Sequence, residues 1–145
     1  MLSEMNRTFD FHGTTMTIKS LTSETGGIYT ILYAVHPPNV GPALHVHPRG
    51  NECFYIVKGR YKFVLGNKLM DTAPGDLIVV QKNMSHKFTV GDGGGEVLII
   101  SPPDLENYFL QVSDLLLKGP VTWELESQIA QQYGQVFLEN TNHWK

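Results

Sequence analysis

Short runs of apolar, β-branched and aromatic residues recur along the first hundred positions, and turn residues separate them. The runs lie at Met16 and Ile18 and at 28–35, 52–57, 60–65, 77–80, 86–90 and 97–100. Glycine, proline and asparagine dominate the gaps, for example at 37–39, 73–76 and 91–95. Runs of this length between turns are typical of strands. Their even spacing predicts a sandwich or barrel.

After residue 103 the spacing of apolar residues changes to that of helices. On the segment 104–118 one face carries Leu105, Phe109, Val112 and Leu116. A second helix is expected over 122–136, with Leu125, Ile129, Tyr133 and Val136 on its apolar face. Asp104 is the expected N-cap of the first helix, and the Gly119-Pro120 pair ends it. Gly134 is a candidate stop inside the second helix.

These patterns predict a mainly β fold. An antiparallel β-barrel or double-sheet jelly roll is expected over about 8–101, followed by the two C-terminal helices near 102–138. The whole chain, 1–145, is expected to form a single domain, because domains commonly hold about 100–200 residues. Only 17% of the residues are charged and 41% are hydrophobic, which argues against disorder.

Charge and composition exclude several classes of partner. The formal net charge is −3 and no basic stripe is present, so nucleic acid is not expected to bind. The longest apolar run, 31–35, is far shorter than the roughly 20 residues of a membrane span. The first residues lack the pattern of a signal peptide. Cys53 is the only cysteine, which precludes an internal disulfide. A cytoplasmic location is therefore expected.

The candidate chemistry lies in a cluster of histidines and one glutamate. His45 and His47 are two positions apart, so on a strand both imidazoles point from one face. Glu52 follows the 48–51 turn, which can return its carboxylate toward them. Buried and unpaired, this carboxylate would cost several kcal/mol, about 2–7 for a polar group, and a cation compensates it directly.

His86 begins another β run and can supply a third imidazole from a neighbouring strand. Three nitrogens and one carboxylate oxygen suit a first-row divalent transition metal such as Fe, Mn, Ni, Zn or Cu. By contrast, His12, His36 and His143 stand alone and are interpreted as ordinary core or surface residues.

The spacing of these residues resembles the two motifs of the cupin superfamily. His45-Val46-His47-x4-Glu52-x6-Gly59 is similar to the first motif and Gly75-x10-His86 to the second. The resemblance covers about residues 25–101. It implies a small β-barrel with one metal ion inside, held by His45, His47, Glu52 and His86. Asn39 and Asn83 stand where the family has glycines, and asparagine tolerates a positive φ better than most residues.

The segment 101–109 is similar to the strand-to-helix exit of small quercetin-dioxygenase-like cupins. This resemblance implies a dioxygenase-like activity, with Glu52 as a base that leaves the metal transiently. The alternation of side chains along a strand also predicts the pocket walls. If Glu52 faces inward, Phe54 and Ile56 do so too, and if His86 faces inward, so does Phe88. An aromatic or otherwise hydrophobic small-molecule substrate fits such walls. Cys53 has the opposite parity and is expected to pack outward.

Three functions stay open at this point. The first is a metal-dependent oxygenase acting on a small aromatic or enolisable substrate. The second is a non-redox isomerase or lyase with the same ligands, and the third is a small-molecule-binding protein without turnover. A homodimer is also expected, because Leu115 and Leu117 cannot both join the apolar stripe of the first helix. With Trp123 they offer apolar surface for a second subunit.

Overall fold

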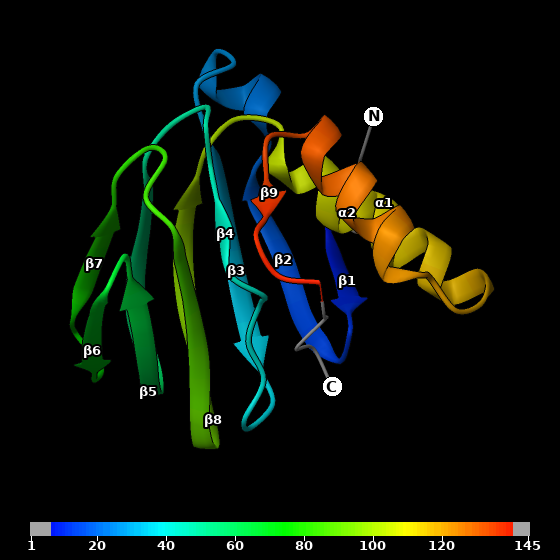
Figure 1. Cartoon of the computed structure of the whole chain (residues 1–145). Coiled ribbons are helices and arrows are strands. Elements are labelled where there is room, and N and C mark those ends of the chain that lie inside the picture. The colour runs from blue at the N-terminus through cyan, green and yellow to red at the C-terminus, as the bar shows by residue number, and fades with distance from the viewer. Residues whose placement is uncertain (1–6, 141–145) are drawn as a thin grey trace.

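A curved antiparallel sheet forms most of the computed structural model, which describes residues 7–140 (Figure 1). In chain order the elements are β1 (Thr8–Phe11), β2 (Thr14–Ser20), the 3-10 helix η2 (Thr22–Thr25), β3 (Thr30–His36), β4 (His45–Val46), β5 (Glu52–Leu65), β6 (Lys68–Thr72), β7 (Leu77–Val80), β8 (His86–Ser101), α1 (Leu105–Lys118), α2 (Trp123–Gln132) and β9 (Val136–Phe137). The prediction of a mainly β, antiparallel fold with two C-terminal helices is confirmed.

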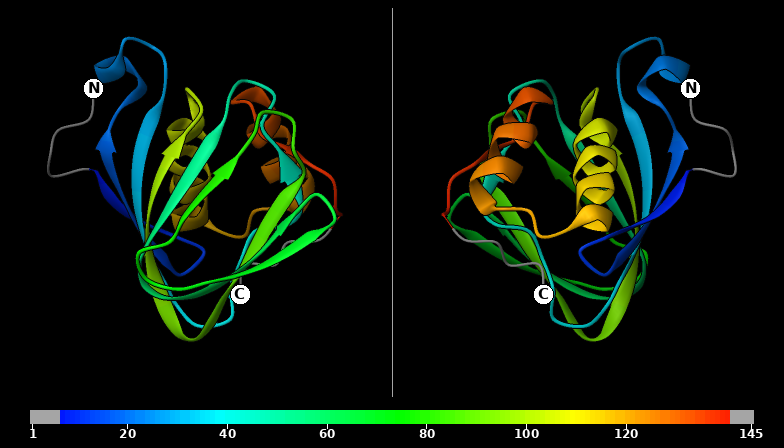
Figure 2. Two further views of the ribbon diagram at one scale, coloured as in Figure 1. Left: turned by 90° about the vertical axis from the view of Figure 1, so that its left-hand side faces the viewer. Right: turned by 90° about the vertical axis from the view of Figure 1, so that its right-hand side faces the viewer.

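Two long strands, β5 and β8, join the two sides of the sheet. They pair with each other along nearly their whole length, from Cys53 opposite Ile100 to Leu65 opposite His86. The second half of β8 also pairs with β3, while its first residue pairs with β4. The strands therefore curve into a V-shaped double layer whose two sides meet at one edge (Figure 2).

The sheet is continuous at one expected turn and at one expected break between strands. The glycine-rich stretch 91–95 does not reverse the chain but lies within β8, where the register with β5 shifts. Gly59 likewise lies within β5, at φ 81°, and joins the two predicted runs into one strand. A Cβ on Gly59 would meet the carbonyl oxygen of Gly94, so the close approach of β5 and β8 requires a glycine here.

The two helices lie together beside β1, β2 and β9 (Figure 1). Leu105 and Val112 of α1 are buried as predicted, and Phe109 and Leu116 pack against the same core. Leu115 is half-buried against it too, whereas Leu117 is 84% exposed. In the part of the chain that the structure describes, no helix is long and apolar enough to cross a bilayer.

The prediction for the second helix is wrong at its end. It stops at Gln132 rather than at residue 136, because Gly134 adopts φ 89° and ends the helical path. Val136 then pairs with Val46 in the sheet, and Leu125 is 41% exposed instead of packing inward. Thr122 caps α2, accepting a hydrogen bond from the Leu125 backbone N–H.

The expected cap of the first helix is also different in detail. Asp104 holds the N-cap position of α1 but makes no side-chain capping bond there. Its φ of 73° turns the carboxylate away, and Oδ2 accepts a hydrogen bond from Arg49 at 3.3 Å instead. The Arg49 guanidinium also donates to the carbonyl oxygen of Gln132 at 3.0 Å. Arg49 therefore connects the start of α1 and the end of α2 to the turn before β5.

Candidate metal centre

Four side chains converge inside the sheet, and each comes from a residue at or next to the end of a strand. His45 lies on β4, His47 follows it, Glu52 begins β5 and His86 begins β8. Their ligand atoms all lie within 4.8 Å of one another, and all four residues are buried. His45 and His86 are register partners across β4 and β8. The group could hold a metal ion.

Two turns position these residues and are bonded to each other. The backbone N–H of Asn83 donates to the carbonyl oxygen of His47 at 3.0 Å. The backbone N–H of Lys82 donates to Oδ1 of Asn51 at 2.7 Å. Asn83 has φ 66° and Asn39 has φ 64°, so both asparagines adopt the left-handed conformation for which glycine is the usual residue. The altered turns therefore keep their shape.

Backbone carbonyls fix the orientation of two imidazoles. Nδ1–H of His45 donates to the carbonyl oxygen of Ala43 at 2.7 Å, and Nδ1–H of His86 donates to that of Met84 at 2.9 Å. In the neutral ring the proton is then on Nδ1, so Nε2 carries the lone pair that a metal needs. Histidine ligands of metal sites are commonly held by such bonds.

Glu52 lies between the other side chains. Its Oε1 is 3.0 Å from Nε2 of His47 and 3.1 Å from Nε2 of His86, and its Oε2 accepts a hydrogen bond from the Ser101 hydroxyl at 2.7 Å. Burial alone would raise the pKa of Glu52, but the neighbouring imidazoles, His47 above all, outweigh it and hold the pKa well below its usual range. The carboxyl group is therefore ionised.

The donor set fits a cation for two reasons. Nε2 of His47 and Nε2 of His86 lie 3.0 and 3.1 Å from the same oxygen, Oε1 of Glu52, so two nitrogens and a carboxylate oxygen already face one point. In addition, buried Nδ1 of His47 has no hydrogen-bond partner among residues 7–140. Burial, and then the neighbouring His86 and His47, lower the pKa of His45 well below its usual value, so this ring stays neutral and able to coordinate.

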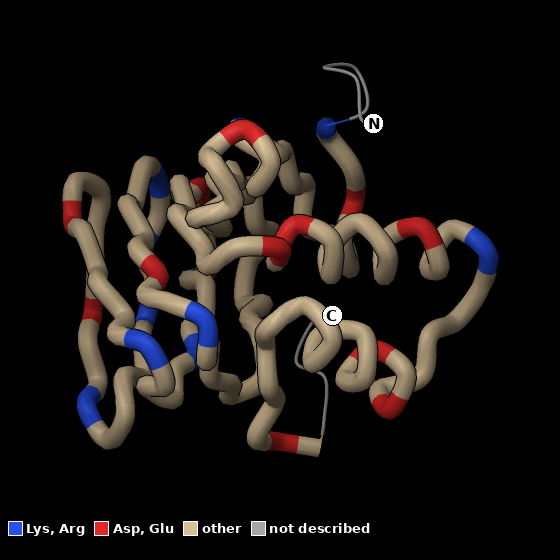
Figure 3. Tube along the Cα trace, turned by 90° about the horizontal axis from the view of Figure 1, so that it is seen from above, with Lys and Arg blue, Asp and Glu red and all other residues tan. Residues whose placement is uncertain are grey.

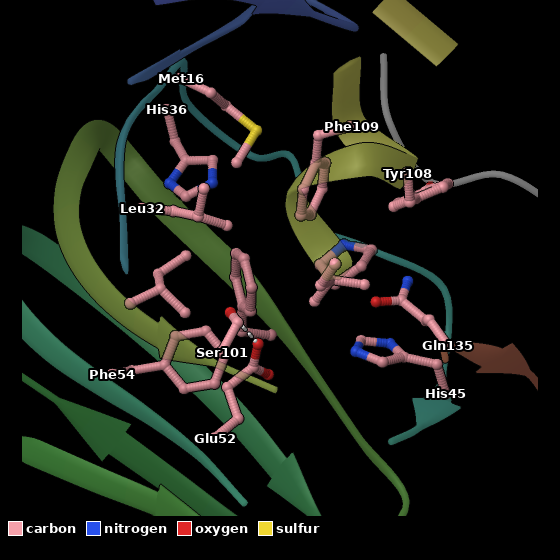
Figure 4. A pocket seen from close by; sticks show the side chains of 14 residues that line it. Met16, Leu32, His36, His45, Glu52, Phe54, Ser101, Tyr108, Phe109 and Gln135 are labelled. Atoms are coloured by element: carbon pink, nitrogen blue, oxygen red, sulfur yellow. Dashed lines mark hydrogen bonds between the residues drawn. The ribbon is translucent and has the colours of Figure 1, made fainter. Parts of the chain in front are cut away.

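An apolar pocket adjoins the group, as Figure 4 shows. Its walls come from β2, β3, β5, β8, α1 and the segment after α2. They consist of Met16, Leu32, His36, Pro42, His45, Glu52, Phe54, Phe88, Ile99, Ser101, Leu105, Tyr108, Phe109 and Gln135. The polar atoms of Glu52, Ser101 and His45 lie together on one side, so a ligand would meet one polar end and an apolar body.

The residues expected in the pocket separate into two groups. Phe54 and Phe88 line it, whereas Ile56 is fully buried in the core and is not among its lining residues. Ile56 faces inward as parity requires, but it lies deeper in the sheet. Cys53 is half-buried on the outer side, and burial raises the pKa of its thiol, so it is not a reactive thiolate.

Two of the isolated histidines have specific partners. His36 is buried in the pocket wall with Nδ1 2.7 Å from the Tyr61 hydroxyl. His12 bonds to the buried Glu126 at 2.8 Å. His143 lies outside the described residues.

Several pocket residues were not anticipated from the sequence. Ser101 continues the inward alternation of Val97 and Ile99, so strand parity extended by one step would have found it. Tyr108 lies one position before Phe109 on a helix whose stripe was recognised. No local signal marks Gln135, which the helical spacing placed inside a helix.

Comparison with known proteins agrees with this geometry. The family model described as "Cupin domain" matches residues 32–101, the segment that contains all four residues of the group. The chain belongs to the cupin superfamily. The comparison with curated proteins finds no match.

Solved cupin-type structures share the fold at low sequence identity. KdgF from Halomonas sp. aligns with a TM-score of 0.58 and 18% identity, over 70% of this chain and 90% of that one. The polyketide cyclase RemF from Streptomyces resistomycificus gives 0.57 and 18%, over 70% and 78%. A predicted oxalate decarboxylase from Thermotoga maritima gives 0.59 and 18%, over 71% and 98%. At this identity the likeness establishes the cupin fold alone.

Proposed function

We propose that this cupin binds one divalent transition metal ion through His45, His47, Glu52 and His86, and that it is a metal-dependent enzyme acting on a small molecule. The observation that carries the proposal is the convergence of four buried ligand atoms at the polar end of an apolar pocket. Perturbed titratable groups in such a pocket are typical of functional sites.

A metal bound here would supply Lewis acidity, and a redox-active ion would also exchange electrons with a co-substrate. The chain's own residues do the rest. Phe54, Phe88 and Phe109 exclude water and hold an apolar or aromatic body. Glu52 is the proposed base, because among the described residues that line the pocket it carries the only carboxylate. The Ser101 hydroxyl, which donates to Oε2, orients that carboxylate.

The leading activity is a dioxygenase-like oxidation of an aromatic or enolisable substrate. The pocket walls support it, because Phe54, Phe88 and Phe109 line the pocket together with the polar groups and favour an aromatic or apolar substrate. The location proposed for this activity is the cytoplasm.

A non-redox isomerase or lyase is the second candidate. It is favoured by the names of two structural relatives, a cyclase and a predicted oxalate decarboxylase, which denote bond rearrangement or cleavage. Binding without turnover is the third possibility, because the cupin fold by itself does not determine chemistry.

One experiment in two stages separates these functions. Elemental analysis of protein produced without added metal gives the ion and its stoichiometry. The loaded protein is then screened with aromatic and enolisable compounds under air and under nitrogen. Oxygen uptake that requires both metal and substrate supports the oxygenase. Equal turnover under nitrogen supports the isomerase or lyase, and binding without turnover supports the third function. Protein that takes up no metal contradicts the proposal.

We also propose that the chain forms a homodimer, through the outer face of the sheet rather than through the helices. Trp123, expected at an interface, packs against Phe137 within the chain, with ring centroids 4.5 Å apart. In contrast, adjacent strands β7, β5 and β8 expose a continuous apolar surface. It includes Tyr55, Leu77, Val79 and Ile100, which are 40–61% exposed. Register places Tyr55 opposite Leu77, and Cys53 opposite both Val79 and Ile100.

A further inference from the structure

Gln135 is a buried amide that points into the pocket beside His45 (Figure 4). Only 4% of the residue is exposed. Within residues 7–140 its side chain makes no hydrogen bond, although its backbone N–H donates to the carbonyl oxygen of Ala130 at 2.9 Å. Its amide nitrogen and oxygen are not among the fully buried side-chain atoms that lack a partner in the described residues, so they face the space of the pocket. An amide that faces this space beside His45 can donate to, or accept from, a ligand held there.

The backbone holds Gln135 firmly in this place. Immediately after it, Val136 and Phe137 pair with Val46 and His45 of β4. Immediately before it, Gly134 packs against the Arg49 side chain so closely that a Cβ would lie 2.8 Å from its Cδ. Arg49 itself holds the end of α2 through the carbonyl oxygen of Gln132. The amide therefore has a fixed position relative to the ligand His45, as a residue that orients a substrate requires.

The charges around the pocket limit what can bind. In the part of the chain that the structure describes, no Lys or Arg lines the pocket. The helices that border it carry four acidic residues and one basic residue, Lys118. Figure 3 shows Asp and Glu along these helices, while most Lys and Arg lie on the side of the molecule that the strands form. A second negative charge on a ligand would therefore be buried without a counter-charge, which is strongly unfavourable.

We propose that Gln135 is a substrate-binding residue whose amide hydrogen-bonds an oxygen of a substrate held at the metal centre. The substrate is a small molecule with an aromatic or apolar body and at most one negative charge, located on an enolate, phenolate or carboxylate oxygen. Its body lies against Phe54, Phe88 and Phe109. The inference rests on the proposed metal centre and adds the substrate class and a residue outside the ligand group.

Benzoylacetone is a suitable probe, because it is a small aromatic β-diketone with one ionisable enol. Its binding to the metal-loaded protein is measured by calorimetry for the wild type, for Gln135→Leu and for Gln131→Leu. Gln131 is an exposed glutamine of α2 and serves as the matched control. We expect Gln135→Leu to bind the probe about tenfold more weakly, the effect of one lost hydrogen bond. The control should bind as the wild type does.

Two further measurements separate substrate binding from a structural role. Metal content and Tm of Gln135→Leu should equal those of the wild type, because the amide makes no hydrogen bond within residues 7–140 that the variant would lose. Oxaloacetate, an enolisable dianion without an aromatic body, should bind far more weakly than benzoylacetone. If Gln135→Leu binds benzoylacetone as tightly as the wild type does, whatever the Tm of the variant, the role of Gln135 is overturned. The proposed substrate class is overturned if oxaloacetate binds more tightly than benzoylacetone, or if the metal-loaded wild type does not bind benzoylacetone. A wild type without metal contradicts the proposed function instead.

Discussion

His45 and His86 face each other across two antiparallel strands, with ring centroids 4.2 Å apart. Each ring is held by an Nδ1–H bond to the backbone two residues earlier, to Ala43 and to Met84. The strand pairing and these two bonds set the spacing of the imidazoles without help from an ion. The site is therefore preorganised, and its four polar groups are costly to the fold unless a cation joins them.

The first prediction concerns metal content. The double substitution His45→Ala with His47→Ala should strip the protein of metal, because it removes two of the four donors. The sheet should remain folded, since the core lies mainly on other residues. Elemental analysis measures the first effect and circular dichroism the second. His12→Gln, which removes an imidazole outside the group, should retain full metal content. Full metal occupancy of the double variant would refute the assignment of the ligands.

Much of the site could be predicted because its spacing is local. His45, His47 and Glu52 lie within eight positions, so strand parity and one turn bring them together. His86 is more distant, and its place follows from the motif resemblance together with the β run it begins. Ser101 follows from the inward alternation of β8 when it is extended by one step. Gln135 reaches the site through the long-range pairing of β9 with β4, which leaves no signal in the neighbouring sequence.

The errors in the fold have the same origin. The stretch 91–95 contains four glycines and was interpreted as a turn, yet Val90 pairs with β5 and Gly95 pairs with both β3 and β5, so β8 continues through the stretch with a shift of register and with Gly94 at φ 73°. Val136 has helical spacing from Ile129, but Gly134 ends the helix and pairing with Val46 places Val136 in a strand. In both segments tertiary hydrogen bonding overrides local preference.

The second prediction is a pH effect on stability through His36. Burial lowers the pKa of His36 to about 3, so the folded protein keeps this ring neutral while the unfolded chain binds a proton below its ordinary pKa of 6.5. The contribution of the neutral, buried His36 to the free energy of unfolding is thus fully present above pH 6.5 and is lost as the pH falls from 6.5 toward 3. At pH 5 the loss from this group is about 2 kcal/mol.

Urea denaturation of metal-free wild type and His36→Gln at pH 7 and pH 5 measures this effect. The fall in the free energy of unfolding between the two pH values should be about 2 kcal/mol smaller in the variant, whatever its stability at pH 7. Other groups, His45 included, contribute equally to both proteins and cancel in the comparison. An identical fall in both would show that His36 is protonated in the folded state.

The third prediction concerns Glu126, a buried carboxylate that is not part of the metal group. Its Oε1 lies 2.8 Å from Nε2 of His12, and its Oε2 accepts a hydrogen bond from the Tyr108 hydroxyl at 2.7 Å. Glu126→Ala leaves both partners unsatisfied and should lower the free energy of unfolding by about 3 kcal/mol. Glu124→Ala, an exposed glutamate on the same helix, should change it by less than about 0.5 kcal/mol. Chemical denaturation of the two variants decides; equal effects would mean that the network contributes nothing specific.

The fourth prediction tests the homodimer and its surface. A charge placed among packed apolar side chains must be desolvated, so Val79→Lys on β7 should shift the protein to monomers if the outer sheet face is the interface. Leu117→Lys changes a leucine that is 84% exposed on α1 and should leave the dimer intact. Light scattering at low micromolar concentration gives the mass of each. A wild-type mass near one chain would refute the dimer, and monomers formed only by Leu117→Lys would return the interface to the helices.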